Sequence, residues 1–279
     1  MINKKITIVI NTFKSEDIIY DCLKSINPKV KVIIVENSKN VNLKNSLESK
    51  FSNIECILSG KNLGYAKGNN LGLSKVQTKY ALILNPDSRL EADTLNKFLN
   101  LANELKDFAI LGPSNQNERN PSKNYKELTE VKYVKGFAMF LNLEQFKEIG
   151  FFDSNFFIYL EEIDLCKRLK DKKKKIYVAP NILINHQGGS SHDEKYKFEM
   201  ELSRNWHWMW SIFYFNKKHK GFLYAFFQVI SKLMSAFTKY IFYSMKNNNT
   251  KKLIYKYRMS GLFNSIIGKT SWYRPFNNK

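Results

Sequence analysis

The stretch "YALILNPDS", residues 80–88, joins a run of five apolar residues to an abrupt polar end. A short apolar run that stops at a turn signal is typical of a strand buried on both faces. Similar apolar runs lie at residues 5–13, 31–37 and 54–60. Amphipathic helical patterns occupy residues 15–26 and 91–105. This alternation predicts an α/β fold whose parallel strands are joined by helical crossovers.

Polar residues follow each of these apolar runs. Thr12, Glu36, Asn62 and Asp87 lie at or just beyond the four predicted strand ends. In open α/β sheets, ligands bind outside the carboxyl ends of the strands. The sequence therefore predicts a ligand site at this edge. Further along, the polar residues 112–132 predict a loop, and residues 131–142 predict a return to strand.

Length and cysteine content set the general class. The 279 residues allow one large or two modest domains. The three cysteines, Cys22, Cys56 and Cys166, have no metal-ligand spacing, and their odd number favours a reducing compartment. The first apolar run is too short for a signal peptide. A cytoplasmic location is therefore expected.

Positive charge is concentrated at the carboxyl end. The formal net charge is +20, and fourteen Lys and Arg residues lie from Arg204 onward, with no Asp or Glu after Glu201. A lysine run also occupies residues 170–176. Such blocks bind nucleic acid or anionic membranes, or are simply solvated.

The segment 204–245 is dense in aromatic residues. On a helix, one polar stripe is formed by Gln228, Ser231, Lys232, Ser235, Thr238 and Lys239. The two lysines argue against a transmembrane span, whereas a wide apolar face with lysines suits a helix lying in a membrane interface. The alternative is packing against the preceding domain or against another subunit of a homo-oligomer. The predicted division is residues 1–203 and 204–279.

Three carboxylates stand in an otherwise apolar segment, "FFIYLEEIDLCKRL", residues 156–169. On a helix, Glu162 falls in the middle of an apolar face, and Glu161 and Asp164 lie on its flank. Desolvation raises the pKa of a carboxyl on such a face, which suits a general base. Alternatively, the helix begins near Leu160 and the acids decorate its first turn, where the dipole favours negative charge.

Three further motifs have both a binding and a structural interpretation. Asn85 and Asp87 flank Pro86, so their oxygens could share a hard cation that holds a diphosphate, or could form an ordinary turn. In "NLGYAKGNNLG", residues 62–72, glycines at a spacing of four allow close approach to a ligand, or form a loop that leads into a helix. His186 ends an apolar run and is either structural or a metal ligand.

Taken in chain order, these blocks resemble family 2 glycosyltransferases of the GT-A fold, in particular the bacterial rhamnosyltransferase branch and its galactofuranosyltransferase relatives. The resemblance covers residues 5–192, and a weaker similarity lies in "YRMSGLFNSIIG", residues 257–268. It implies a GT-A domain with a basic, aromatic helical extension.

The resemblance also implies roles for residues that bind the donor. Thr12 lies in the first nucleotide-binding loop, and Glu36 matches the acid that reads the base or ribose. Asn62, Gly64 and Asn70 match the block that faces the nucleotide sugar.

The implied metal site holds Mg²⁺ or Mn²⁺. Asp87 matches the last acid of the Asp-x-Asp motif, and His186 matches a histidine that completes the metal site in some relatives. Two residues depart from the pattern. Asn85 replaces the first acid, and Lys14 stands where Asn is usual.

The resemblance further implies inverting transfer in which Glu162 accepts the proton of the acceptor hydroxyl. The expected donor is dTDP-rhamnose, with a UDP-hexose second. The expected acceptor is a saccharide on a polyprenyl diphosphate in surface polysaccharide synthesis of the O-antigen or capsule type. Glu161, Asp164 and Arg204 are the candidate acceptor contacts.

The implied location is the anionic inner face of the membrane, with the enzyme bound peripherally. No nucleic-acid partner is expected. Two alternatives from other classes stay open: nucleic-acid binding by the basic aromatic tail, and a scaffold built on an inactive transferase fold.

Overall fold

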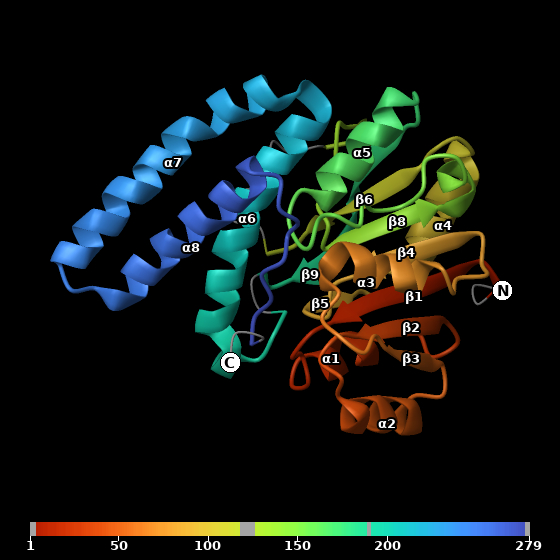
Figure 1. The fold of residues 1–279 in the computed structure, drawn as a ribbon. Coiled ribbons are helices and arrows are strands. Elements are labelled where there is room, and N and C mark those ends of the chain that lie inside the picture. The colour runs from red at the N-terminus through yellow and green to blue at the C-terminus, as the bar shows by residue number, and fades with distance from the viewer. Residues whose placement is uncertain (1–3, 118–125, 189–190, 277–279) are drawn as a thin grey trace. The chain divides into compact units, whose positions relative to one another are not determined.

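The computed structural model describes residues 4–117, 126–188 and 191–276 (Figure 1). The chain divides into two compact units. The first comprises residues 1–152 and 162–194, and the second comprises residues 153–161 and 195–279. The sequence places a single boundary after residue 203. In the structure the carboxyl-terminal unit begins at residue 195 and also includes the internal segment 153–161.

The first unit is built on a nine-stranded mixed sheet in the order β3-β2-β1-β4-β8-β6-β9-β5, with β7 paired to β9. Its parallel part consists of β1 (Ile6–Thr12), β2 (Lys31–Glu36), β3 (Ile54–Leu58) and β4 (Tyr80–Leu84). These strands coincide with the four apolar runs of the sequence. The predicted parallel α/β core is therefore confirmed, because each run is long enough for one strand and has almost no exposed side chain at the centre of the sheet.

The rest of the sheet is largely antiparallel. β8 (Ala138–Asn142) pairs antiparallel with β4, and β5 (Ser88–Leu90) pairs antiparallel with β9 (Ile176–His186). β7 (Thr129–Glu130) also pairs with β9. The strand predicted at residues 131–142 begins only at Ala138, since a turn occupies residues 136 and 137.

Part of the predicted loop 112–132 is in fact strand. β6 (Ile110–Asn115) runs parallel to β9, and its register shifts between Pro113 and Ser114. Proline cannot donate a hydrogen bond to the ladder, so a strand that contains it is bulged. The central part of the predicted loop, residues 118–125, lies outside the described residues.

Five helices belong to this sheet: α1 (Ile19–Lys24), α2 (Val41–Lys50), α3 (Gly64–Leu73), α4 (Thr94–Leu105) and α5 (Glu161–Asp171). α3 packs on β1 and β2, and α4 packs on β9. α4 buries Leu95, Phe98 and Leu99 at helical spacing, and the Phe98 ring stacks on Phe140 of β8 at 4.9 Å. The helical periodicity of the sequence is thus used to cover the sheet.

The glycines of residues 62–72 have a packing function. The sequence leaves open a ligand-binding loop at this position, but α3 begins at Gly64 itself. A Cβ on Gly68 would collide with the Asn11 side chain, and one on Gly72 with Val9. These glycines therefore let the helix approach β1 closely rather than expose backbone to a ligand.

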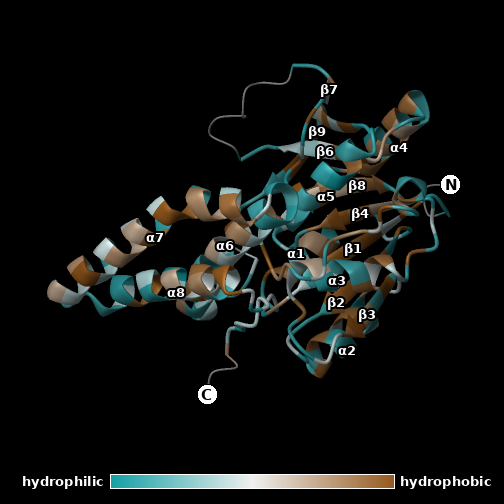
Figure 2. Ribbon diagram, turned by 45° about the horizontal axis from the view of Figure 1, so that its top comes forward, coloured by the Kyte–Doolittle hydropathy of each residue, from teal (hydrophilic) through white to brown (hydrophobic). Residues whose placement is uncertain are grey.

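The second unit consists mainly of three long helices, α6 (Lys197–Lys220), α7 (Phe222–Met245) and α8 (Asn249–Ile266). Gly221, with φ of 86°, separates α6 from α7. Gly261 of α8 lies against the Trp206 backbone of α6, where any larger residue would clash. In Figure 2, α7 carries hydrophobic residues along its length.

The internal segment 153–161 packs on α6 of the same unit. The Ser211 hydroxyl donates to the Ile158 carbonyl at 3.1 Å, and the Tyr214 hydroxyl contacts Asp153 Oδ2 at 3.0 Å. The Phe157 ring stacks on His207 at 4.4 Å. Within the described residues, no helix combines the length and hydropathy needed to cross a membrane.

Candidate active site

Asp87 and His186 meet at the edge of the sheet. Asp87 lies between β4 and β5, and the next residue, Ser88, pairs with His186 in the antiparallel β5–β9 ladder. Asp87 Oδ1 lies 3.4 Å from His186 Nε2, and the Asp87 side chain is 1% exposed. Within the described part of the chain, neither Asp87 oxygen makes a hydrogen bond of good geometry. A buried carboxylate in this state needs another partner.

The His186 ring is held in place from two sides. It stacks on Phe137 with the ring centroids 4.6 Å apart and the planes at 12°. The His186 backbone N–H donates to Asn115 Oδ1 at 3.1 Å, and the Asn115 amide donates back to the His186 carbonyl at 3.1 Å. The imidazole is therefore oriented toward Asp87 by the sheet and not by the carboxylate alone.

The ionisation of Asp87 follows from these contacts. Burial is the largest single effect and acts to raise the pKa of Asp87, but the hydrogen bond and charge of His186, together with Ser191 and the backbone, hold that pKa below its ordinary value. Asp87 is thus an anion at neutral pH. Its charge is available to a cation.

The residues present fit a divalent cation that also takes oxygens from a ligand. A buried carboxylate and an oriented imidazole are suitable ligands for Mn²⁺, and the carboxylate alone suits Mg²⁺. Among the described residues, no three His, Cys, Asp or Glu side chains form a complete metal cluster. Asn85 is fixed through its backbone, since its N–H donates to the Phe137 carbonyl at 2.8 Å. The described side chains thus supply only part of a coordination shell. The remaining positions are open to oxygens of a bound ligand such as a diphosphate.

Glu162 lies near the same turn of residues 136 and 137. It is the second residue of α5 and is partly buried. A Cβ placed on Gly136 would lie 3.6 Å from Glu162 Cγ, and the next residue, Phe137, is the one that stacks on His186. Burial raises the pKa of Glu162, although backbone N–H groups of the first helical turn oppose it. This is the direction that the sequence predicts for a general base.

The two neighbouring acids are not exposed. Asp164 has no exposed surface, and its Oδ2 accepts a hydrogen bond from Arg168 Nε at 2.8 Å. Arg168 Nη1 also donates to the Ile149 carbonyl at 2.9 Å, so the pair fixes the preceding loop. Glu161 is 3% exposed. The carboxylate of Asp164 is thus used in a buried ion pair, and its predicted acceptor contact stays a prediction.

Glu36 and Thr12, which the sequence predicts to bind the nucleotide, form hydrogen bonds with the backbone at the strand ends. Glu36 has no exposed surface, and its two oxygens accept the backbone N–H groups of Ser38 at 2.7 Å and Asn40 at 2.8 Å. The Thr12 hydroxyl donates to the Val35 carbonyl at 3.4 Å. Both side chains shape the strand ends, and the predicted reading of the base by Glu36 stays a prediction.

The predicted donor amides are also engaged. Asn70 forms a pair of hydrogen bonds with the Phe152 backbone, at 2.8 Å from its amide to the carbonyl and 3.0 Å from the N–H to its oxygen. Asn62 Oδ1 accepts the N–H of Gly64 at 3.0 Å and so turns the chain into α3. Asn70 therefore joins α3 to the loop at Phe152, and its predicted contact with the sugar stays a prediction.

Sequence reasoning missed Asn11 and Asn37. The Asn11 amide donates to the Gly64 carbonyl at 2.9 Å, and the Asn37 amide donates to Asn11 Oδ1 at 2.5 Å. Asn37 Oδ1 also accepts the N–H of Leu63 at 3.3 Å. In the sequence, these residues could have been found as the amide side chains at the polar ends of the predicted strands 5–13 and 31–37. Together they tie the glycine-rich segment to β1 and β2.

The unusual Lys14 also has a backbone explanation. Its φ is 55°, in the left-handed region that Asn tolerates better than other non-glycine residues. Its N–H donates to the Ser38 hydroxyl at 2.9 Å, and its carbonyl accepts the N–H of Asp193 at 2.8 Å. The Asn that is usual in the family suits this turn. Arg204, the remaining candidate, lies on α6 in the other unit.

With this geometry in place, comparison with known proteins identifies the family. The model of glycosyl transferase family 2 matches residues 7–166, more than half of the chain. The chain belongs to this family. It is therefore a glycosyltransferase, and the matched range contains Asp87 and Glu162 and ends before His186.

Two curated relatives match this family 2 chain. The hexosyltransferase Agl10 of low-salt glycan biosynthesis, from Haloferax volcanii, is 25% identical over 192 residues, which are 59% of this chain and 61% of that protein. The rhamnosyltransferase WbbL of Escherichia coli strain K12 is 24% identical over 241 residues, which are 72% of this chain and 88% of that protein. The chain thus spans less than two thirds of the length of Agl10.

Solved structures identify the fold as GT-A. The mannosyltransferase PcManGT from Pyrobaculum calidifontis, in complex with GDP-Man and Mn²⁺, superposes with a TM-score of 0.60 at 11% identity, covering 94% of this chain and 87% of that chain. Residues 1–349 of S. aureus TarS give a TM-score of 0.55 at 14% identity, covering 97% of this chain and 93% of that chain. These likenesses concern the fold, including the helical region at the carboxyl end.

Proposed function

We propose that this family 2 enzyme transfers rhamnose from dTDP-rhamnose, with inversion, to a saccharide carried on a polyprenyl diphosphate in surface polysaccharide synthesis. The observation that carries the proposal is the buried Asp87 carboxylate facing His186, whose ring stacks on Phe137, the residue after the Gly136 that Glu162 packs against. The donor sugar rests on the rhamnosyltransferase name of the E. coli relative. A UDP-hexose is the alternative donor, supported by the hexosyltransferase name of the haloarchaeal relative.

The residues divide the chemistry between them. Asp87 and His186, with Asn85, would hold Mg²⁺ or Mn²⁺, whose charge stabilises the departing nucleoside diphosphate when it is bound. Glu162 accepts the proton of the acceptor hydroxyl while that oxygen attacks the anomeric carbon. Its raised pKa makes it a stronger base than an exposed carboxylate. The amides Asn11 and Asn37 keep the α3 segment in position beside the strand ends.

The decisive experiment is calorimetric titration with dTDP, UDP and GDP, each with and without Mn²⁺. Binding of dTDP that requires Mn²⁺ and is lost in Asp87→Asn would support the proposed site and donor. Metal-dependent binding of UDP alone would favour the hexose donor. Equal binding with and without Mn²⁺, unchanged in Asp87→Asn, would refute the metal site.

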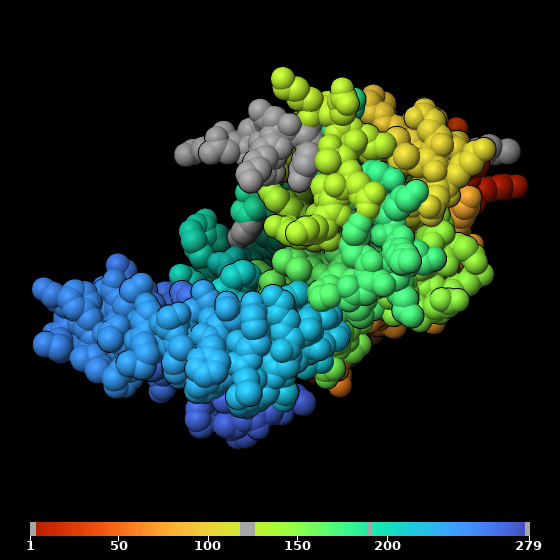
Figure 3. All heavy atoms as spheres, turned by 90° about the horizontal axis from the view of Figure 1, so that it is seen from above, coloured from red at the N-terminus to blue at the C-terminus, as the bar shows by residue number. Residues whose placement is uncertain are grey.

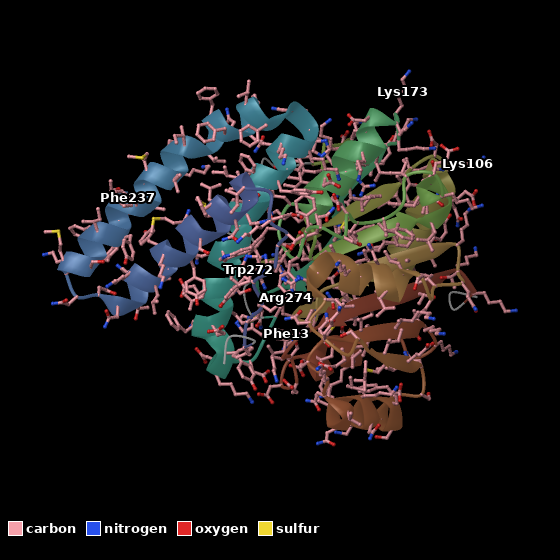
Figure 4. All side chains as sticks on the ribbon, viewed as in Figure 1. Phe13, Lys106, Lys173, Phe237, Trp272 and Arg274 are labelled. Atoms are coloured by element: carbon pink, nitrogen blue, oxygen red, sulfur yellow. The ribbon has the colours of Figure 1, made fainter. Side chains whose placement is uncertain are left out.

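We further propose that residues 204–279 place the enzyme peripherally on the anionic inner face of the membrane. The support is a stripe of exposed apolar side chains on α7, each between 37% and 80% exposed, namely Leu223, Phe227, Ile230, Met234, Phe237, Ile241 and Met245. Their spacing alternates between four and three residues up to Ile241, so they share one face of the helix. Figure 3 shows atoms of α7 at the surface, and Figure 4 labels Phe237.

The charge of this segment fits the same partner. It carries fourteen Lys and Arg residues and no carboxylate side chain. Each basic residue near an anionic leaflet adds about 1 kcal/mol of attraction. A second copy of the chain would bring like charges together at this surface, whereas anionic lipid neutralises them.

A further inference from the structure

A cavity of about 300 Å³ lies between α7 and α8 in the carboxyl-terminal unit. Its polar lining comes from Ser231, Lys232, Ser235 and Lys239 of α7 and from Tyr255 and Arg258 of α8. Liquid water takes up about 30 Å³ per molecule, so the cavity has room for a hydrated oxyanion of several heavy atoms.

Three cations border this cavity without an acidic partner. Among the residues that the structure describes, Lys232, Lys239 and Arg258 form no ion pair, and the sequence has no Asp or Glu after Glu201 that could supply one. Like charges gathered on one surface repel and destabilise the fold that holds them together. A bound anion would remove this cost.

Lys239 and Arg258 both lie near the ring of Tyr255. Lys239 Nζ lies 5.5 Å and Arg258 Cζ 5.9 Å from the centroid of the Tyr255 ring. That ring stacks in turn on Tyr243 at 5.6 Å with the planes at 5°. Cation–π attraction to one immobilised ring therefore keeps both the ammonium and the guanidinium within about 6 Å of a residue that lines the cavity.

The hydrogen-bond donors that line the cavity indicate which anion would bind there. Lys232 and Lys239 are seven residues apart, about two helical turns or roughly 10 Å along the axis, so both flexible side chains can reach a group between them. Arg258 adds a planar fork that matches phosphate oxygens, and the two serines add hydroxyl donors. We propose that this cavity binds a phosphate or diphosphate group, as a second anion site of the protein.

The site goes beyond the proposed transfer reaction, because it lies in the other unit and uses no residue of the Asp87 site. Two sources of the same chemistry are conceivable: a free diphosphate, and the phosphates of a lipid. On a helical wheel, the cavity side of α7 is opposite the apolar stripe. A lipid phosphate would therefore enter from a different side than the stripe faces, which the experiment below tests.

The test is calorimetric titration of the full chain with inorganic diphosphate in EDTA. Every protein carries Asp87→Asn, so that the proposed metal site takes up none of the probe. We expect saturable binding that weakens about tenfold or more in Lys239→Gln/Arg258→Gln, since the loss of one charge-assisted contact lowers affinity by about that factor. Lys256→Gln, an exposed lysine of α8 outside the cavity, is the matched control and should bind as before.

Equal affinity in the cavity variant and in the Lys256→Gln control would overturn the proposal, since general surface charge would then explain the binding. If Arg258→Gln lowers the helical circular dichroism, the pair Lys232→Gln/Lys239→Gln replaces it, because both lysines are exposed. Vesicles of phosphatidylglycerol identify the source, with Lys246→Gln/Lys256→Gln, two exposed lysines outside the cavity, as the control of equal charge. A lipid phosphate predicts that the cavity variant loses more vesicle binding than this control, and a free diphosphate predicts equal losses. When Asp87 is kept, Mn²⁺-dependent nucleotide binding should be the same in all of these variants. The proposed anion site and the proposed metal site are therefore tested independently.

Discussion

Asp87 Oδ1 and His186 Nε2 lie 3.4 Å apart across the antiparallel pair β5–β9, although nearly a hundred residues separate them in the chain. The pairing of Ser88 with His186 sets this distance. A buried carboxylate and a partly buried imidazole are thus presented at one strand edge. A cation bound there would be held by the sheet itself.

Substitution of His186 should therefore affect metal-dependent binding alone. We expect His186→Gln to weaken Mn²⁺-dependent binding of the nucleoside diphosphate about tenfold or more, because even outer-shell changes at metal sites cost that much. Titration calorimetry with and without EDTA measures it. His219→Gln, on α6 of the other unit, is the matched control. An unchanged Mn²⁺ dependence in His186→Gln would remove this histidine from the site.

The buried Glu162 carboxylate should lower the stability of the fold at neutral pH while being required for turnover. Its pKa is raised by burial from the ordinary 4.5, so the charged form is costly in the folded state. Such a carboxyl contributes stability that is fully present below pH 4.5 and is lost as pH rises through its folded pKa. We expect Glu162→Gln to lower turnover about 10²- to 10⁴-fold while raising the thermal midpoint at pH 7 and not at pH 4. Full turnover of Glu162→Gln would show that another group is the base.

Gly72 should be intolerant of any side chain. A Cβ there would collide with Val9, which is fully buried in β1. We expect Gly72→Ala to reduce the free energy of unfolding by about 1–3 kcal/mol, as overpacking does in other cores. Lys67→Ala, on the exposed side of the same helix, should change it by no more than about 0.5 kcal/mol. Chemical denaturation compares the two, and equal effects would contradict the packing explanation.

His207 should make stability depend on pH. Burial, followed by the charge of Arg274, lowers the pKa of His207 to about 3, whereas its ordinary value is 6.5. The unfolded chain therefore binds a proton that the folded chain refuses between these values, and stability falls as pH drops from 6.5 toward 3. The slope reaches about 1.4 kcal/mol per pH unit for one proton.

His207→Gln removes this proton and keeps an N–H that can donate to the Tyr273 carbonyl, which His207 Nε2 contacts at 3.0 Å. We expect the variant to show a flatter dependence of the unfolding free energy between pH 6.5 and 4, measured by urea denaturation. The same slope in both proteins would mean that other groups set the acid sensitivity.

The apolar stripe of α7 should control membrane binding. Burying a Phe side chain is worth about 1.5–3 kcal/mol, so Phe227→Ser/Phe237→Ser should weaken binding to phosphatidylglycerol vesicles at least about tenfold. Thr238→Ala, exposed on the polar side of α7, is the control. Flotation measures binding. Unchanged flotation, or a dimer seen by light scattering that the double variant abolishes, would assign the stripe to another partner.

Patterns that extend over a few residues were readable in the sequence. The apolar runs gave the four parallel strands, because a strand buried on both faces needs consecutive apolar residues. The carboxylates at the start of α5 gave Glu162 and the direction of its pKa, since a charge among apolar neighbours is desolvated wherever the chain places it. The excess of lysine and arginine in the tail likewise needs no tertiary structure to be seen.

The tertiary structure decided which polar side chains remain available. Asn70, Glu36 and Asp164 have the residue types of a binding site, yet each already has a backbone or arginine partner. That partner is distant in the chain for Asn70, in the adjoining loop for Glu36 and one helical turn away for Asp164. Sequence patterns report which groups can form hydrogen bonds, but only strand pairing and packing determine which groups have already formed them. For the same physical reason, the approach of Asp87 to His186 and the gathering of Lys239 and Arg258 at one ring are visible only in the folded chain.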